Sequence, residues 1–600
     1  MRQQRKQRRR QRKRRRRLDP AVDTGMLKAN AKDRQLTTEQ ALSRTTPRPL
    51  SGAELLLRGL IDRGVDTIYI NPGTDTAPLA RAIEIALSEA RPAPRLVLCP
   101  HETVALAAAH AHFAVTGQVS AVFVHVDVGT QNLGAMVHNA ARAGAGVIIM
   151  AGLTPYDEYG TVHGGRDHIV HWMQDAPDQA GIVRQYVKAT FNPSHASLVH
   201  KTVQRAIDIA AAAPSGPVYL TFGREMLIET APEPEAPRLG SLFSSGPSSE
   251  ATAASLREIR ASKHPVLVTS RVGQDPEAVA PFTRLAELIG ATVIDPLKER
   301  MNFPPTHPLA ATNVAAAWAE ADLAIVLDAP VPWILGKEGP RRDCRILLID
   351  TDPLHVAMPN WAFPADVRVA SSPRVWLETI VARLESEGAR PVPLGRPPLV
   401  PKRPTPGASL TAEDVLAVLA DHITAEDRLI EESTTSAGFV RQWLPRTVPG
   451  TLFRAGGAGL GWALGALLGT MAAEPERPTF VVVGDGSFIF SAPVAALTAL
   501  RRERVDGLIV VLQNGGYAAS SQPVHDLFPD AERPQPPATA FLAEVDIAGI
   551  AAACGATGFT VSSPEDLADG IKRAVAAWRQ GGLVVLAARI SSPWIKPADY

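Results

Sequence analysis

Cysteine, aromatic residues and long apolar runs are all scarce in this sequence. Three cysteines occur in 600 residues, at Cys99, Cys344 and Cys554. Their wide separation gives no metal-ligand spacing and no disulfide framework, which is typical of a reducing cytoplasm. One stretch of 19 residues, 455–473, lacks charge but is mostly glycine and alanine. It predicts a closely packed internal helix. We therefore expect a cytoplasmic protein without a membrane segment.

Acidic residues are absent from the first 17 positions, which contain 12 lysines and arginines. The remaining chain has 50 basic and 61 acidic residues, a net charge of −11. Because like charges repel, we expect residues 1–47 to form a disordered basic extension. Such a tail could bind nucleic acid, which is not an expected partner of the remaining chain. The alternative that we favour is an over-long translation start upstream of Met26. The stretch also lacks the apolar core of a secretory signal.

The chain is too long for one hydrophobic core. Proline-rich, irregular stretches at 231–250 and 387–409 predict two linkers. Between them, short Val- and Ile-rich runs such as DTIYI, GVIIMAG, LAIVLD and GLIVVLQN alternate with helical patterns. This alternation predicts an α/β fold of three doubly wound parallel-sheet domains. Their predicted boundaries are 48–230, 251–386 and 410–600.

Polar side chains end two buried runs of the third block. VVVGDGSFIF contains Asp485, and GLIVVLQN ends 29 residues later at Asn514. Ligands of doubly wound sheets bind at the carboxyl ends of the strands, and a strand–helix–strand unit of this length places two such ends side by side. Carboxylate and amide oxygens suit Mg²⁺, and a carbonyl near Gly516 could add a third oxygen. Backbone amides of Gly486 and Ser487 could hold a phosphate. The alternative explanation is a pair of ordinary turn residues.

The pair GDGS and QNGG resembles the signature of the thiamin diphosphate enzymes that include acetolactate synthase and benzoylformate decarboxylase. Gln513 stands where the first asparagine of that signature is usual. The resemblance covers nearly the whole chain from about Pro49, and its three blocks would be the pyrimidine-binding, middle and diphosphate-binding domains. It implies thiamin diphosphate and Mg²⁺ as cofactors, with Asp485, Asn514 and the Gly516 carbonyl as metal ligands. It further implies cofactor contacts from Glu102, Thr434, Gly459, Leu460, Gly484, Gly486, Ser487, Gly516 and Tyr517.

Two motifs of the first block resemble the same family. NPGTDTAPL and HETVALAAAHAHFAV look like its PG-T/S element and its H-E-x-x-A helix. The resemblance implies that Glu102 is the catalytic acid. A carboxyl group bonded to the aminopyrimidine ring would favour removal of the weakly acidic cofactor proton, and an apolar pocket would raise its pKa. Alone, Glu102 could be a helix N-terminal residue that interacts with the helix dipole.

Five residues bear on which reaction is catalysed. His125 ends the run VSAVFVHV and resembles an active-site histidine of benzoylformate decarboxylase, and Thr74 lies where that enzyme has a substrate-binding serine. His307 resembles its second active-site histidine, although acetolactate synthases share this motif. Gln174 and Lys188 instead lie near the spacing of substrate-side residues of acetolactate synthase. The middle block has no clear flavin-binding glycine turn, which makes FAD doubtful.

We therefore expect an acetolactate-synthase-like enzyme that decarboxylates a 2-oxo acid and protonates or transfers the acyl carbanion. One alternative is a simple decarboxylase like benzoylformate decarboxylase. Another is a binding protein that keeps the fold without catalysis. The resemblance implies that the first block of one chain meets the third block of another, so we expect a homodimer or a homotetramer.

Overall fold

The computed structural model describes residues 48–235, 240, 244–394, 401–405, 407–530, 536, 538–541 and 545–593. The predicted basic extension, residues 1–47, lies outside the described residues. From Pro49 onwards the chain forms one compact unit. Its described part contains three parallel sheets and one short antiparallel pair.

The first sheet has the strand order β3-β2-β4-β5-β7-β6, and all its neighbours are parallel. Successive side chains of its strands enter opposite cores: Ile68 and Ile70 pack into one, and Tyr69 into the other. The strands are β2 (Thr67–Ile70), β3 (Arg95–Leu98), β4 (Ser120–Val124), β5 (Val147–Leu153), β6 (Thr190–Phe191) and β7 (Val218–Gly223), beside the antiparallel pair β1 (Leu50–Ser51) and β8 (Thr230–Ala231). The helices are α2 (Gly52–Ile61), η2 (Thr74–Thr76), α3 (Ala77–Ser88), α4 (Glu102–Thr116), α5 (Val126–Asn132), α6 (Ala135–Arg142), α7 (Val170–Met173), η3 (Gln179–Ile182), α8 (Ala196–Ala211) and α9 (Arg224–Ile228).

The second sheet has the order β10-β9-β11-β12-β13 and is also parallel. A separate apolar cluster lies on each of its faces. Its strands are β9 (Pro265–Thr269), β10 (Thr292–Ile294), β11 (Leu323–Leu327), β12 (Arg345–Asp350) and β13 (Val367–Ala370). Its helices are α10 (Ser249–Ala261), η4 (Val272–Gln274), η5 (Pro276–Ala278), α11 (Val279–Ile289), α12 (Val314–Glu320) and α13 (Pro373–Ser386).

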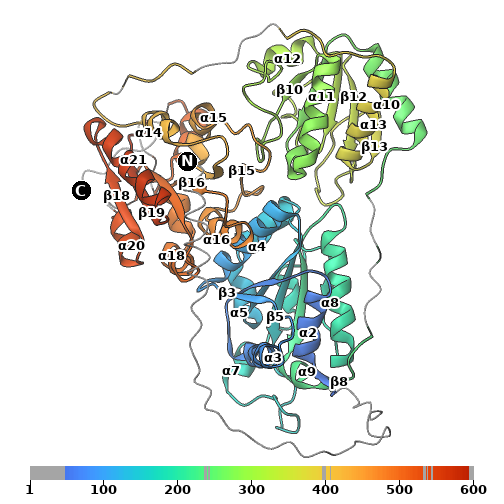
Figure 1. The fold of residues 1–600 in the computed structure, drawn as a ribbon, viewed down its shortest axis with the longest axis vertical. Coiled ribbons are helices and arrows are strands. Elements are labelled where there is room, and N and C mark those ends of the chain that lie inside the picture. The colour runs from blue at the N-terminus through green and yellow to red at the C-terminus, as the bar shows by residue number, and fades with distance from the viewer. Residues whose placement is uncertain are drawn as a thin grey trace, which may run out of the picture. The chain divides into compact units, whose positions relative to one another are not determined.

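The third sheet has the order β15-β14-β16-β17-β19-β18, again with parallel neighbours. Its strands are β14 (Arg428–Glu432), β15 (Leu452–Phe453), β16 (Thr479–Gly484), β17 (Gly507–Gln513), β18 (Thr557–Val561) and β19 (Leu583–Arg589). Its helices are α14 (Ala412–Leu419), η6 (Ala420–His422), η7 (Thr434–Ser436), α15 (Ala437–Trp443), α16 (Ala463–Ala473), α17 (Asp485–Phe490), α18 (Pro493–Arg502), α19 (Ala518–Leu527), α20 (Ile547–Ala553) and α21 (Pro564–Arg579). Figure 1 shows helices on the faces of each sheet, which confirms the predicted fold class.

Helices α4 and α16 join the first and third sheets through one continuous apolar core. Two glycines of α16 permit this close approach. A Cβ atom at Gly469 would lie 1.8 Å from the carbonyl oxygen of Ala108, and one at Gly465 would lie 2.9 Å from that of Val104. The uncharged stretch 455–473 therefore ends in a packed internal helix, as predicted. No helix among the described residues combines the length and apolar character of a membrane span.

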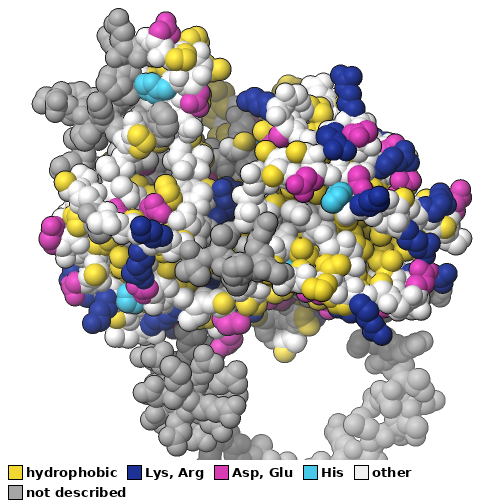
Figure 2. All heavy atoms as spheres, turned by 90° about the horizontal axis from the view of Figure 1, so that it is seen from above, with side chains coloured by type: hydrophobic (Ala, Val, Ile, Leu, Met, Phe, Trp, Pro, Cys, Tyr) yellow, Lys and Arg dark blue, Asp and Glu magenta, His cyan; other side chains and the backbone are white. Residues whose placement is uncertain are grey.

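Charges of both signs are mixed on one face of the described residues (Figure 2). In the view of Figure 2, basic and acidic side chains alternate and form no broad patch of one sign. This face therefore lacks the basic stripe that a nucleic-acid interface would need.

Candidate functional site

The carboxyl edge of the third sheet brings Asp485 and Asn514 together. Asp485 begins α17 directly after β16, and Asn514 follows the neighbouring parallel strand β17. The Asp485 carboxylate accepts hydrogen bonds from the backbone amides of Gly486, at 2.9 Å, and Gly515, at 2.7 Å. Gly515 has a φ of +80°, so it makes the tight turn that returns the chain to Asp485.

The Asp485 carboxylate has no cationic side chain beside it among the described residues. It is only 3% exposed, and burial raises its pKa to about 6. Asn514 lies next to it and uses Oδ1 to accept a hydrogen bond from the Gly516 amide at 3.0 Å. A buried carboxylate held only by amides, beside a side-chain amide oxygen, fits a bound Mg²⁺.

Gly486 and Tyr517 lie against one another beside this pair. A Cβ atom at Gly486 would come within 2.9 Å of the Tyr517 ring, so only glycine fits there. The ring also meets Phe490 and Phe541 edge to face. Ser487 is buried in the same first turn of α17, and Gly484 has open space around its α-carbon. The backbone at Gly484 can therefore be approached closely by a ligand, whereas the α-carbon of Gly486 is covered by the Tyr517 ring.

The loop before α16 places Leu460 between two other parts of the molecule. Gly459 exchanges two hydrogen bonds with Asn139 of α6, at 2.8 and 2.9 Å. Gly461 donates to the Glu432 carboxylate at 2.7 Å, and Ala463 donates to it at 2.8 Å. Burial raises the pKa of Glu432 to about 7. Leu460, half-buried, is therefore held in a loop with fixed ends.

Thr434, the predicted cofactor contact after β14, has a strained backbone. It is exposed and has a φ of +38°, which is rare for a residue with a branched side chain. Helix α19 lies against this turn. Such strain is concentrated at ligand sites, where the surrounding structure enforces it.

Glu102 opens α4 in the first block and is 8% exposed. Asn132, the last residue of α5, donates a hydrogen bond to its carboxylate at 3.2 Å. Gly129 lies beside the other oxygen, since a Cβ atom there would be 3.5 Å from Glu102 Oε1, and His101 Nδ1 is 3.8 Å from Oε2. Glu102 is therefore buried and is oriented by Asn132.

His125 lies at the start of α5 and pairs with Asp75. His125 Nδ1 is 2.6 Å from Asp75 Oδ1, and Asp75 is buried. The hydrogen bond that the Asp75 carboxylate accepts raises the pKa of His125, and burial opposes this effect. Gln174 hydrogen-bonds the same imidazole. A small pocket adjoins the pair and is lined by Thr74, Asp75, Val126, Leu153, Pro155, His171, Gln174 and Arg224.

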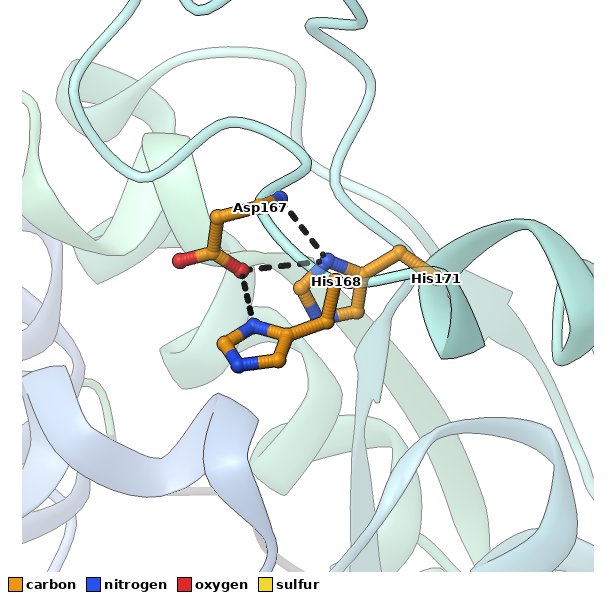
Figure 3. A group of neighbouring side chains, drawn as sticks. All are labelled: Asp167, His168 and His171. Carbon is orange, nitrogen blue, oxygen red and sulfur yellow. Dashed lines mark hydrogen bonds and ion pairs between the residues drawn. The ribbon is translucent and has the colours of Figure 1, made fainter.

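A hydrogen-bonded network around Asp167 fixes the segment that carries Gln174. Figure 3 shows its carboxylate between His168 Nδ1, at 2.8 Å, and His171 Nδ1, at 3.4 Å. This set resembles a metal site. However, Arg224 lies 3.2 Å from the same carboxylate oxygen, and the Asp167 amide donates to His171 Nδ1. The guanidinium repels a cation and the amide occupies the imidazole lone pair, so the network orders the segment instead.

Two residues discussed from the sequence have other neighbours. His307 bonds Glu287 at 3.4 Å and packs against Phe303. Lys188 donates to the carbonyls of Ile209 and Ala212 at the end of α8. In the part of the chain that the structure describes, no hydrogen bond or ion pair joins the first-block pair Glu102 and His125 to Asp485 or Asn514.

Sequence reasoning missed Asp75 and Asn132. Asp75 lies inside the NPGTDTAPL motif, where only Thr74 was considered. Asn132 lies in HVDVGTQNLG, seven residues after His125. Helix α5 lies between His125 and Asn132. A polar residue at each end of this helix was therefore the signal in the sequence that could have identified Asn132.

Comparison with known proteins identifies the class. Residues 50–182 match the thiamine pyrophosphate enzyme, N-terminal TPP binding domain, and residues 433–588 match the C-terminal TPP binding domain. The chain is a member of this family of thiamin diphosphate enzymes.

Particular relatives include both branches considered from the sequence. The chain is 26% identical to benzoylformate decarboxylase of Pseudomonas aeruginosa, over 86% of this chain and 95% of that protein. It is 25% identical to an acetolactate synthase large subunit of Mycobacterium tuberculosis, over 88% and 86%. The solved 4-hydroxybenzoylformate decarboxylase of Rhodococcus jostii, 23% identical, superposes with a TM-score of 0.77 over 90% of this chain and 99% of that one.

Proposed function

We propose that the protein is a thiamin diphosphate- and Mg²⁺-dependent decarboxylase of a 2-oxo acid that releases an aldehyde. The observation that carries this choice is His125, an imidazole in the first block whose pKa is raised by its bond to Asp75. A protonated histidine is a general acid that can supply the proton of an aldehyde C–H bond. Decarboxylation followed by protonation requires such a donor.

The residues of the third block would hold the cofactor. Asp485, Asn514 and the Gly516 carbonyl would bind Mg²⁺, and the backbone of Gly486 and Ser487 would face the diphosphate. Thr434, Gly459, Leu460, Gly484 and Tyr517 would surround the rest of the cofactor. Thiamin diphosphate, when bound, supplies the carbon that adds to the 2-oxo group and accepts the electrons left by CO₂.

Residues of the first block would handle protons. Glu102, buried and bonded to Asn132, would hold a proton at the aminopyrimidine ring. Thr74, exposed beside the Asp75 pocket, would contact the substrate. His307, which bonds Glu287, would be a further substrate contact, as the resemblance to benzoylformate decarboxylase implies.

A homodimer would complete this site. Glu102 and Asp485 make no described contact within one chain, yet both belong to the reaction. Apolar side chains beside the candidate residues are exposed in the single chain: Val128 is 47% exposed, Phe490 55% and Val494 60%. Burial of these side chains by the first and third blocks of a second copy is favourable. A tetramer would pair two such dimers.

Acetolactate-synthase-like carboligation is the second candidate. Gln174, which matches that enzyme by spacing, bonds His125 and could orient an acceptor carbonyl. Lys188 gives no support, because its ammonium group bonds carbonyls at the end of α8.

A product assay tests the proposal. Purified protein with thiamin diphosphate and Mg²⁺ is offered benzoylformate or pyruvate, and the products are separated. We expect aldehyde without a coupled product, and Glu102→Gln should lower turnover by about 10²- to 10⁴-fold while the cofactor still binds in calorimetry. Acetolactate from pyruvate would instead support carboligation. Failure to bind thiamin diphosphate with Mg²⁺ would contradict the proposal.

A further inference from the structure

We propose that Asp75 is a positioning residue that fixes the ring of His125 and keeps it protonated, so that the reaction ends in proton delivery. This inference rests on the proposed function and gives a structural reason why His125 would act as the proton donor. Asp75 lies in η2, which follows β2, whereas His125 directly precedes α5, fifty residues later. The pair therefore joins two loops at one edge of the first sheet.

The geometry of the pair is that of a built contact. The 2.6 Å distance from His125 Nδ1 to Asp75 Oδ1 is typical of a charge-assisted hydrogen bond. The second carboxylate oxygen accepts the Val126 amide at 3.4 Å. Asp75 is 5% exposed and has no arginine or lysine partner among the described residues. Its charge is therefore compensated mainly by the imidazole.

Two glycines make room for the pair. A Cβ atom at Gly152 would lie 1.8 Å from Asp75 Oδ2, and one at Gly73 would lie 2.2 Å from His125 Nδ1. Either overlap would displace the carboxylate or the ring. Because Gly73 and Gly152 have no side chains, the carboxylate and the imidazole can occupy the space beside them.

The contact fixes which nitrogen can deliver a proton. An ionised carboxylate only accepts, so Nδ1 carries hydrogen and Nε2 is the exchangeable position. When a proton passes from Nε2 to the carbon left by CO₂, an N–H bond breaks and a C–H bond forms. Neutral His125 then regains a proton from water. Gln174, which bonds the ring, would give way to the substrate.

Other charged groups around the pair have smaller roles. Asp127 on α5 also raises the pKa of His125, but less than Asp75 does. His171 and Arg224 line the pocket that Asp75 borders. Both are engaged by the Asp167 network, which holds them in place. Asp75 is thus the dominant partner of the His125 ring.

NMR titration of the histidines in the full chain tests the pairing without any substrate. We expect Asp75→Asn to lower the pKa of His125 by about one pH unit or more, because an opposite charge is removed. The matched control is Asp62→Asn, which breaks the remote His200–Asp62 contact of 2.8 Å and should leave His125 unchanged. An unchanged His125 pKa in Asp75→Asn would overturn the inference. If that variant does not fold, Asp75→Ser removes the charge with a smaller side chain.

Product analysis tests the consequence for the reaction. With a 2-oxo acid that the protein turns over, Asp75→Asn should move the alkaline limb of the kcat profile to lower pH by the same amount. The kcat of the variant should fall by a larger factor than its KM changes. When an aldehyde is added, a larger share of turnovers should give the coupled product. An unmoved pH profile would overturn the proposed role. Absence of turnover with wild-type protein would count against the proposed function alone, because the titration still decides the pairing.

Discussion

Two buried aspartates at opposite edges of the third sheet differ in how their charge is compensated. Asp427 precedes β14, and both its oxygens bond the Arg579 guanidinium, at 2.6 and 2.5 Å. Asp485 follows β16, the neighbouring strand, and within the described part of the chain its carboxylate bonds only backbone amides. The two are equally inaccessible, at 2% and 3% exposure.

This difference is the one expected between a structural carboxylate, Asp427, and the ligand-binding carboxylate that we propose, Asp485. A buried charge without a partner is costly, so the fold supplies Arg579 where nothing else will bind. At Asp485 it leaves the charge uncompensated, which raises its pKa to about 6. Such a group is stabilised fully only by a cation from solution. If Asp485 binds Mg²⁺ as proposed, the amino end of the sheet has a carboxylate that maintains the fold, and the carboxyl end has one that holds the cofactor.

The largest expected effect comes from Asp485→Asn. We expect Mg²⁺-dependent binding of thiamin diphosphate to weaken by more than about 100-fold, since even groups behind a metal ligand contribute 10- to 100-fold. The thermal stability of the protein without cofactor should not fall, because the variant removes an uncompensated charge. Calorimetry and thermal unfolding measure the two quantities.

The outcome that breaks the comparison is a large loss of stability in cofactor-free Asp485→Asn with little change in binding. It would mean that Asp485 acts like Asp427. Asn514→Ala is the companion variant at the second ligand and should weaken binding in the same direction.

Asp427→Asn should have the opposite profile. Loss of the bidentate contact with Arg579 should lower the free energy of unfolding by about 2–3 kcal/mol, less than for a fully enclosed pair because Arg579 is partly exposed. Cofactor affinity, measured well below the melting temperature, should stay within about twofold of wild type. Denaturant unfolding measures the free energy of unfolding. A comparable loss of cofactor affinity would contradict the idea that the two ends of the sheet have separate roles.

The fold was largely predictable from the sequence because its central strands are buried on both faces. The stretches LIVVL and FVVV therefore contain no polar residue, and they lie within β17 and β16. Edge strands carry no such signal. β18 is partly exposed along its length, and β15 has only two residues.

Only those residues of the candidate site that directly follow a buried strand were predictable from the sequence. Asp485 and Asn514 follow apolar runs, so their proximity could be expected from topology. The Asp75–His125 contact could not, because it depends on how two loops fifty residues apart meet and on small residues at 73 and 152. The difference between Asp427, whose charge is compensated by Arg579, and Asp485, whose charge is not, likewise depends on tertiary contacts that the sequence does not reveal. The domain boundaries remain predictions.

The smallest expected effect concerns Glu432, a third buried carboxylate of this sheet. Like Asp485 it accepts only backbone amides, from Gly461 and Ala463, but it is assigned no metal. Its pKa rises from 4.5 to about 7 on folding, so the folded state binds the proton more tightly than the unfolded one. Its stabilising contribution is therefore complete below about pH 4.5 and is lost as the pH rises to about 7. We expect the wild-type free energy of unfolding to fall by about 3 kcal/mol over this window relative to Glu432→Gln, by denaturant titration at several pH values. Saturating Mg²⁺ and thiamin diphosphate should leave that difference in place, since no cation neutralises Glu432. If the cofactor abolishes this stability difference, the charge of Glu432 is also compensated by the bound ligand. Glu432 would then differ from Asp427 in the same way as Asp485 does.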